Sequence, residues 1–74
     1  MTTEPTRRYI ARAYPTHGGE WEATVYYIVG HNLFHRVASA SWIFETPEAA
    51  LRASEHWIAK YRPNGVLERS ELCR

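Results

Sequence analysis

His31 and His35 stand four residues apart, a spacing at which two imidazoles on one helix can bind a metal ion. Gly30 precedes them in a predicted turn, so the two rings lose a common face. Ser39 and Ser41 alternate a few residues further on, where a hydroxyl nucleophile beside His35 would be activated. No glycine-flanked elbow and no orienting acid accompanies them. Ordinary turn and strand polarity explains these residues better than a metal site or acyl transfer does.

The acidic residues and the cysteine narrow the chemistry further. All 8 acids are glutamates, whereas aspartate is the commonest partner of a triad histidine and of an oxygen-ligand metal loop. Cys73 is the only cysteine, which excludes an intramolecular disulfide or a thiolate metal cluster and fits a reducing compartment. We therefore expect no enzyme activity, no cofactor and no bound metal.

Alternating side chains predict three β-strands, over about residues 8–14, 21–29 and 33–44. Proline and glycines before the second strand, and glycine with asparagine before the third, supply the turns of two hairpins. Side-chain parity sets both registers, because one face of each strand must be apolar. The predicted partners are Arg12 with Glu22 in the first hairpin, and Val29 with Phe34 and Trp21 with Trp42 in the second.

Residues 47–61 are predicted to form one α-helix. Thr46 can cap it, Pro47 is tolerated at its first position, and Glu48 complements the helix dipole. Pro63 helps to end it. An apolar stripe on this helix is expected to pack on the sheet and to bring Trp57 into one core with the other two tryptophans. Its members are Ala50, Leu51, Ser54, Trp57, Ile58 and Tyr61.

These elements predict an α+β fold, a three-stranded antiparallel sheet in the order 1-2-3 with one C-terminal helix packed on one face. We expect a flexible lead over residues 1–7, a single βββα domain over 8–65, and a C-terminal tail over 66–74, in which Val66 and Leu67 add a short edge strand. No secretory signal and no apolar run of membrane-spanning length is present. The expected protein is cytoplasmic and has no membrane partner.

The sheet face that the helix leaves open is the predicted binding surface. A solvated sheet face alternates to polar residues more strictly than this one does. Aromatic residues and arginine are enriched at interfaces, although tyrosine, isoleucine and valine also suit strands wherever they point. The candidate binding residues are Arg8, Ile10, Arg12, Tyr14, Tyr26, Ile28, His35 and Val37.

A protein partner fits this surface better than nucleic acid. The formal net charge is +1, whereas a protein that tracks phosphates usually carries a clear basic excess. Tyr14 and Tyr26 beside arginine also describe a platform for single-stranded RNA, but neither lies in an RNP-like motif. We expect the face to bind a host protein or nucleoprotein complex, or a second copy of the chain as a homodimer.

Residues 8–61 resemble the strand-strand-strand-helix unit of HicB-type antitoxins. The resemblance runs through residues 8–14, 19–25, the capped run 46–51 and residues 58–61. It implies a regulator that binds a toxin or nucleic acid. The chain lacks that family's usual stretch before the third strand and its appended helix-turn-helix.

In size and in its sheet-and-helix layout the chain also looks like the small phage-encoded anti-CRISPR proteins, which share no common motif. This resemblance implies a non-catalytic inhibitor that acts on a large host protein or nucleoprotein. The function expected from the sequence is therefore a non-catalytic protein-binding module, an inhibitor of a host defence complex from a phage or mobile element. The alternative is a HicB-like antitoxin or RNA-associated regulator that uses the open sheet face.

Overall fold

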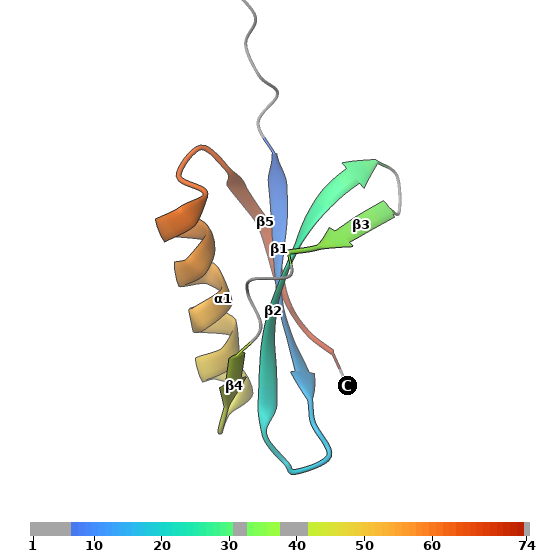
Figure 1. Cartoon of the computed structure of the whole chain (residues 1–74), viewed down its shortest axis with the longest axis vertical. Helices are drawn as coiled ribbons and strands as arrows, with labels where there is room; N and C mark the ends of the chain where they lie inside the picture. The colour runs from blue at the N-terminus through green and yellow to red at the C-terminus, as the bar shows by residue number, and fades with distance from the viewer. Residues whose placement is uncertain (1–6, 31–32, 38–41, 74) are drawn as a thin grey trace, which may run out of the picture.

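A computed structural model of the chain describes residues 7–30, 33–37 and 42–73. The elements follow the order β1 (Arg8–Pro15), β2 (Trp21–Gly30), β3 (Leu33–Arg36), β4 (Trp42–Phe44), α1 (Pro47–Tyr61) and β5 (Val66–Leu72). The α+β class and the packing of the helix on the sheet are as predicted (Figure 1). The predictions for His31, Ser39, Ser41 and residues 1–6 fall outside the described residues.

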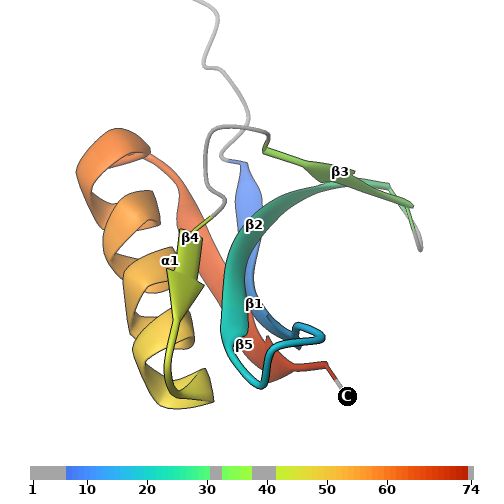
Figure 2. The same ribbon diagram turned by 60° about the horizontal axis from the view of Figure 1, so that its bottom comes forward.

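The sheet is larger than predicted and is mixed rather than purely antiparallel. In the described part of the chain it has 5 strands, with the order β3-β2-β1-β5 and with β4 also paired to β2. β5 runs parallel to β1, and the other pairs are antiparallel. The helix covers one side, and the strands curve around the other (Figure 2). We call these two sides the helix face and the far face.

β5 was predicted only as a tail with a short edge strand, because its side chains do not alternate regularly. A β-bulge explains this irregularity. Tyr9 pairs with Leu67, but its neighbour Ile10 pairs with Arg69, so Glu68 is an extra residue in β5. The bulge interrupts the two-residue period, and this leaves the strand with the mixed pattern of a weak sequence signal.

The register of the first hairpin differs from the prediction by two residues. Arg12 pairs with Thr24 rather than with Glu22, although each residue keeps the predicted face because the shift is even. The turn is centred one residue later than expected. The Thr16 amide donates to the Glu20 carbonyl at 2.8 Å, and Gly19 adopts a positive φ of 82° inside this loop.

The predicted third strand divides into β3 and β4, and β3 presents the opposite face to the predicted one. Gly30 pairs with Leu33, but Ile28 pairs with Phe34, so Val29 is an extra residue in β2. The predicted pairing of Val29 with Phe34 is therefore wrong. β4 keeps the predicted parity but is shifted along β2, so that Trp21 lies opposite Phe44.

The helix begins and ends as predicted, at Pro47 and Tyr61. The Thr46 side chain accepts a hydrogen bond from the Ala49 amide at 3.1 Å, which satisfies one of the free donors of the first turn. After the helix the chain passes close over β1 at Gly65. A Cβ there would come within 2.5 Å of the Tyr9 ring, so this connection requires glycine.

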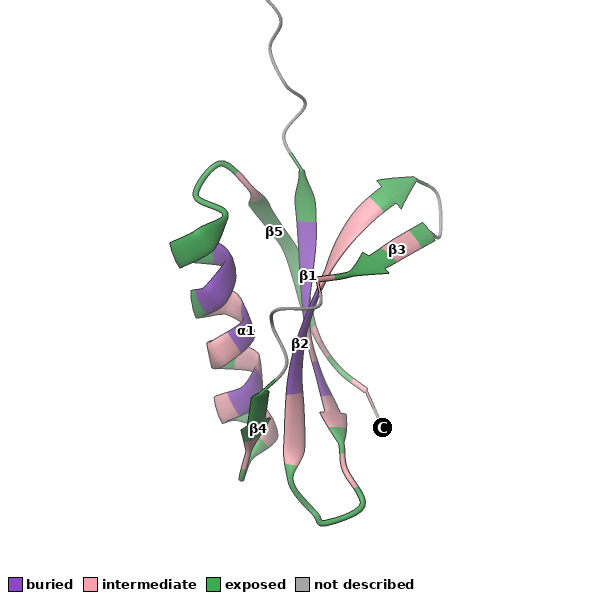
Figure 3. Cartoon of the chain, viewed as in Figure 1, coloured by how far each residue is buried: buried purple, intermediate pink, exposed green. Residues whose placement is uncertain are grey.

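Two clusters form the core on the helix face. One contains Tyr9, Ala11, Val25, Trp57 and Ile58, and the other contains Ala13, Ala23 and Ala50. Buried positions follow β1, the middle of β2 and one face of α1, whereas β3 and β4 hold none of them (Figure 3). The predicted common core of three tryptophans is wrong. Trp57 lies in the first cluster, Trp21 packs beside the second, and Trp42 is 37% exposed.

Candidate functional site

The far face brings together most of the sequence-predicted binding residues. Residues with even numbers on β1 and β2 point away from the helix, and they include Arg8, Ile10, Arg12, Tyr14, Tyr26 and Ile28. The two candidate residues from the predicted third strand, one in β3 and one just after it, do not join them. His35 stacks on Tyr27 with ring centroids 5.4 Å apart, and Val37 packs against the helix-face core. The bulge at Val29 causes this inversion, and it places Phe34 and Arg36 on the far face instead.

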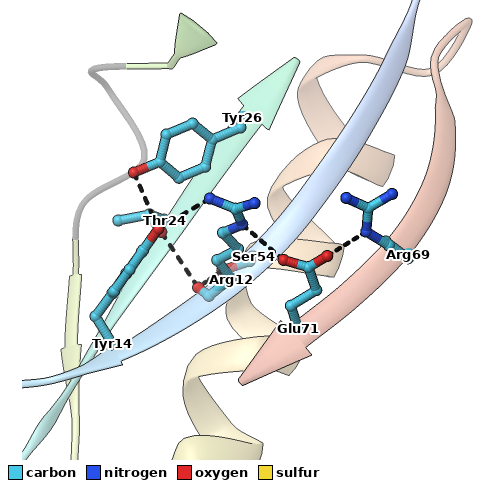
Figure 4. Close-up of polar contacts among 7 residues, drawn as sticks. All are labelled: Arg12, Tyr14, Thr24, Tyr26, Ser54, Arg69 and Glu71. Atoms are coloured by element: carbon cyan, nitrogen blue, oxygen red, sulfur yellow. Dashed lines mark hydrogen bonds and ion pairs between the residues drawn. The ribbon is translucent and has the colours of Figure 1, made fainter. Parts of the chain in front are cut away.

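Arg12 is the centre of the far face (Figure 4). Its Nε donates to Glu71 Oε2 at 2.9 Å, and its Nη1 donates to the Tyr14 hydroxyl at 3.1 Å. The guanidinium also lies 4.9 Å from the Tyr26 ring centroid and 5.3 Å from that of Phe34. Burial acts to lower the pKa of Arg12, but the contacts with Tyr14 and Glu71 together outweigh it and raise that pKa above its ordinary value. The guanidinium of Arg12 is thus held by hydrogen bonds along its edge and by two aromatic rings of the same chain.

Two neighbours extend this network. The Tyr14 hydroxyl donates to the Tyr26 hydroxyl at 3.3 Å, and the two rings meet edge to face. Burial, with the hydrogen bond to Tyr26, raises the pKa of Tyr14 to about 12. Glu71 accepts from both Arg69 and Arg12, and the hydrogen bond from Arg69 is the main reason that its pKa lies below the usual value. At neutral pH Arg12 therefore contacts the neutral phenol of Tyr14 and the ionised carboxylate of Glu71.

Ile10 lies beneath this polar network and is not available to a partner. It is 0% exposed, although it points away from the helix. Its register partners are Tyr26 and Arg69, which carry long side chains on either side of it. The Phe34 ring lies within reach of the Arg69 guanidinium, at 5.9 Å, and of Arg12. At Ile10 the predicted open apolar face is therefore covered by side chains of the chain itself, whereas Tyr26 and Ile28 are half-buried.

The remaining arginines of the far face are paired as well. Arg8 donates to Glu68 at 3.2 Å, and Arg36 donates to Glu22 at 2.6 Å. The predicted contact between Arg12 and Glu22 is wrong, because each of these residues has another charged partner. Exposed pairs of this kind contribute up to about 1 kcal/mol each to stability. Charge on the far face is thus largely balanced within the chain.

A second candidate site lies between β4 and the second half of α1. It is a pocket of about 250 Å³ lined by Trp42, Phe44, Ala53, His56, Trp57, Lys60 and Tyr61. Trp57 and Tyr61 stand with ring centroids 5.3 Å apart and planes tilted by 44°. Trp57 belongs to the core, whereas Tyr61 is 51% exposed and Trp42 also reaches solvent. Two of the rings that line the pocket, Trp42 on β4 and Tyr61 on α1, are therefore partly exposed to solvent.

Two cationic side chains lie over rings that line this pocket. Lys60 Nζ lies 5.2 Å from the Tyr61 ring centroid, and the Arg62 guanidinium carbon lies 4.9 Å from that of Trp57. His56 is one helical turn before Lys60 and lines the same pocket. Within the described part of the chain, Lys60 and Arg62 form no ion pair. The pocket thus pairs apolar rings with positive charge that no glutamate neutralises there.

Sequence reasoning did not find this pocket. It assigned Tyr61 to the helix stripe buried on the sheet and Trp42 to the common core. The signal for it was the length of that stripe, because Tyr61, one turn after Trp57, extends it along the helix beyond what the short strand β4 can cover.

The described residues contain no group of three His, Cys or acidic side chains placed to hold a metal ion. Among them there is also no helix with the length and apolar character needed to cross a membrane. Comparison of the chain with protein-family models, with curated proteins and with solved structures gives no match. The site must therefore be interpreted from its own geometry.

Proposed function

We propose that this chain is a non-catalytic protein-binding module, and that the pocket between β4 and α1 receives a side chain of its partner. The observation that carries the proposal is the pocket itself, in which Trp42 of the strand and Tyr61 of the helix remain partly exposed above the buried Trp57. Tryptophan and tyrosine that are partly exposed around a concave apolar site are typical anchors of protein interfaces.

The rim of the pocket supports its use as an interface. Trp42 from β4 and Tyr61 from α1 are 37% and 51% exposed there, and β4 is a short strand of three residues. Exposed apolar side chains around an apolar pocket mark surfaces that bind other proteins. Lys60 and Arg62 would form the polar rim that such interfaces have.

The far face supports partner binding less well than the sequence suggested. Ile10 is buried, His35 and Val37 lie on the helix face, and Arg12 is held by Glu71 and Tyr14. A partner would have to break these contacts before it could replace them, and each broken hydrogen bond to a charged group costs about 1.5 to 3 kcal/mol.

The proposal also includes a biological role, that of an inhibitor. A small module that binds a host protein or nucleoprotein complex, without chemistry of its own, acts as an inhibitor by occupying a surface. The resemblance to anti-CRISPR proteins motivates this role, and the pocket supplies a surface for it.

The test is affinity capture from nuclease-treated bacterial lysate. It compares the wild-type chain with Trp42→Ala/Tyr61→Ala and with Val29→Ala/Leu33→Ala, a control that also removes two exposed apolar side chains. We expect the wild type and the control to retain the same protein, and the pocket variant to lose about tenfold or more of it. All three chains are first compared by thermal melting.

Two results would overturn the proposal. One is retention of the same protein by a folded pocket variant. The other is a species that the wild type captures from a parallel untreated lysate but not from the nuclease-treated one, which would assign the surface to nucleic acid.

A further inference from the structure

We infer that the segment taken up by this pocket is acidic, with one bulky apolar side chain flanked by carboxylates. This inference rests on the proposed function and adds the chemistry of the partner to it. It follows from the size of the pocket, from the distribution of charge around it and from the orientation of its rings.

The pocket is large enough for a complete side chain. Its volume is about 250 Å³. An apolar cavity of about 150 Å³ lined by aliphatic and aromatic residues is known to bind benzene. A phenylalanine, leucine or methionine side chain therefore fits between Trp42 and Tyr61. The lining gives such a side chain mainly apolar contacts, because Phe44, Ala53 and Trp57 form the rest of the wall.

The permanent charge at the pocket has one sign. Lys60 lines the pocket, Arg62 stands over Trp57, and no acidic residue belongs to the lining. The helix does carry acids, but one of them is directed elsewhere. Glu55 accepts a hydrogen bond from Ser70 of β5, on the side of the helix away from the pocket. A partner segment would therefore meet positive charge on entering.

The cations are placed to reach a bound segment. Lys60 lines the pocket, with its Nζ 5.2 Å from the Tyr61 ring centroid. Arg62 is not part of the lining but lies over the ring of Trp57, which is. Both cationic residues are exposed, so their charges lie at the surface beside these rings. Arg62 Nη1 donates to the Tyr61 carbonyl at 2.9 Å, which leaves its other donors available to a carboxylate. Carboxylates on either side of an apolar anchor would pair with these two groups.

A nucleotide matches the pocket less well. Base recognition uses stacking on an open ring face together with hydrogen bonds to the base edge. The Trp57 face is occupied by Arg62, and Tyr61 is tilted by 44° against Trp57 rather than parallel to it.

The test is selection from a random peptide library displayed on phage, with the full chain as the target. The wild type is compared with the charge-reversal variant Lys60→Glu/Arg62→Glu and with Arg8→Glu/Arg69→Glu, which makes the same change on the far face. We expect wild-type peptides to share one bulky apolar residue with Asp or Glu within two positions. The far-face variant is expected to select the same peptides, and the pocket variant to prefer Lys and Arg instead.

A synthetic peptide with the selected consensus then gives the affinity by fluorescence anisotropy. We expect about tenfold weaker binding or more to the charge-reversal variant. If that variant melts early, Lys60→Gln/Arg62→Gln replaces it, and the acidic preference is expected to disappear.

Three results would overturn the inference. They are selection of no peptide, selection without an acidic preference, and a preference that the charge reversal at Lys60 and Arg62 leaves unchanged. If the wild type still captures a lysate protein that Trp42→Ala/Tyr61→Ala does not capture, the proposed function stands even though the acidic segment is wrong. If the peptide selection fails and the pocket variant also captures as much protein as the wild type, the proposed function is refuted as well.

Discussion

The far face of the sheet and the pocket beside α1 both place arginine or lysine over aromatic rings, but they differ in the source of negative charge. On the far face Arg12 lies between Tyr26 and Phe34 and is paired with Glu71 of β5. At the pocket Lys60 and Arg62 also stand over rings, yet no carboxylate of the lining joins them. The chain itself supplies the carboxylate on one surface, and the lining of the other contains none.

This difference shows how an aromatic and basic composition can serve either folding or binding. The addition of β5 converts the far face from an open sheet into a covered one, because Arg69 and Glu71 flank Ile10 and Arg12 there. β4 is too short to do the same for the second half of the helix. Whether such a cluster is covered or exposed therefore depends on the neighbouring strand that packs beside it, and not on the residue types within the cluster.

The largest expected effect separates the floor of the pocket from its rim. Trp57→Ala removes a side chain that is only 6% exposed, and it should lower the free energy of unfolding by about 3 to 5 kcal/mol. Tyr61→Ala, at the exposed rim, is expected to cost less than about 1 kcal/mol. Urea denaturation measures both. Equal losses would mean that the rim is part of the core and is unavailable for binding.

The next prediction concerns the closed state of the far face. Ile10→Ala should lower the free energy of unfolding by about 2 to 5 kcal/mol, because the network above Ile10 leaves it fully buried. Ile43→Ala on exposed β4 is the matched control, with an expected change within about 0.5 kcal/mol. The same urea midpoints measure both variants. If Ile10→Ala were as mild as Ile43→Ala, the far face would be open after all.

A smaller effect distinguishes the central arginine from its exposed counterpart. Arg12→Leu removes the partner of Glu71 and Tyr14 and is expected to cost about 1 to 3 kcal/mol. Arg8→Leu breaks the ion pair with Glu68. Because the Arg8 side chain is 57% exposed, the expected loss of unfolding free energy is about 1 kcal/mol or less. Chemical denaturation of both variants checks this ranking, and the reverse order would show that the network does not hold the far face together.

The smallest effect is a dependence on alkaline pH. The pKa of Tyr14 is about 12 in the folded chain and 10.0 without the fold, so the fold favours its protonated form. The stability that this adds is complete below about pH 10 and is lost as the pH rises through about 12. We expect the wild type to lose stability above pH 10 more steeply than Tyr14→Phe does. Parallel curves would mean that the Tyr14 hydroxyl is free in water.

The helix and the faces of the first two strands could be predicted from the sequence. Thr46 and Pro47 give a direct signal for a helix start, and the alternation in β1 and β2 is regular. β3 and β5 could not be predicted in the same way. The extra residues at Val29 and Glu68 change the side-chain period, and a bulge has no local signal in a single sequence.

The candidate site was harder to predict than the fold, for a related physical reason. Six of the eight proposed residues do lie on the far face, but exposure there depends on side chains from β5 and β3. The pocket depends on where β4 ends relative to α1, which is a tertiary distance. Composition predicted clusters of aromatic and basic residues, but not which of the two clusters would remain partly exposed.

The most direct test of the account uses the indole signals of the three tryptophans in a ¹H–¹⁵N correlation spectrum. Trp42 and Trp57 line the pocket, whereas Trp21 packs beside the alanine cluster of β1, β2 and α1. The spectrum is recorded as the captured protein, or the selected acidic peptide, is added to the labelled chain. The account predicts that the Trp42 and Trp57 indole signals shift or broaden while that of Trp21 stays in place. Unchanged pocket indoles, with shifts confined to the amides of β1, β3 and β5, would contradict it.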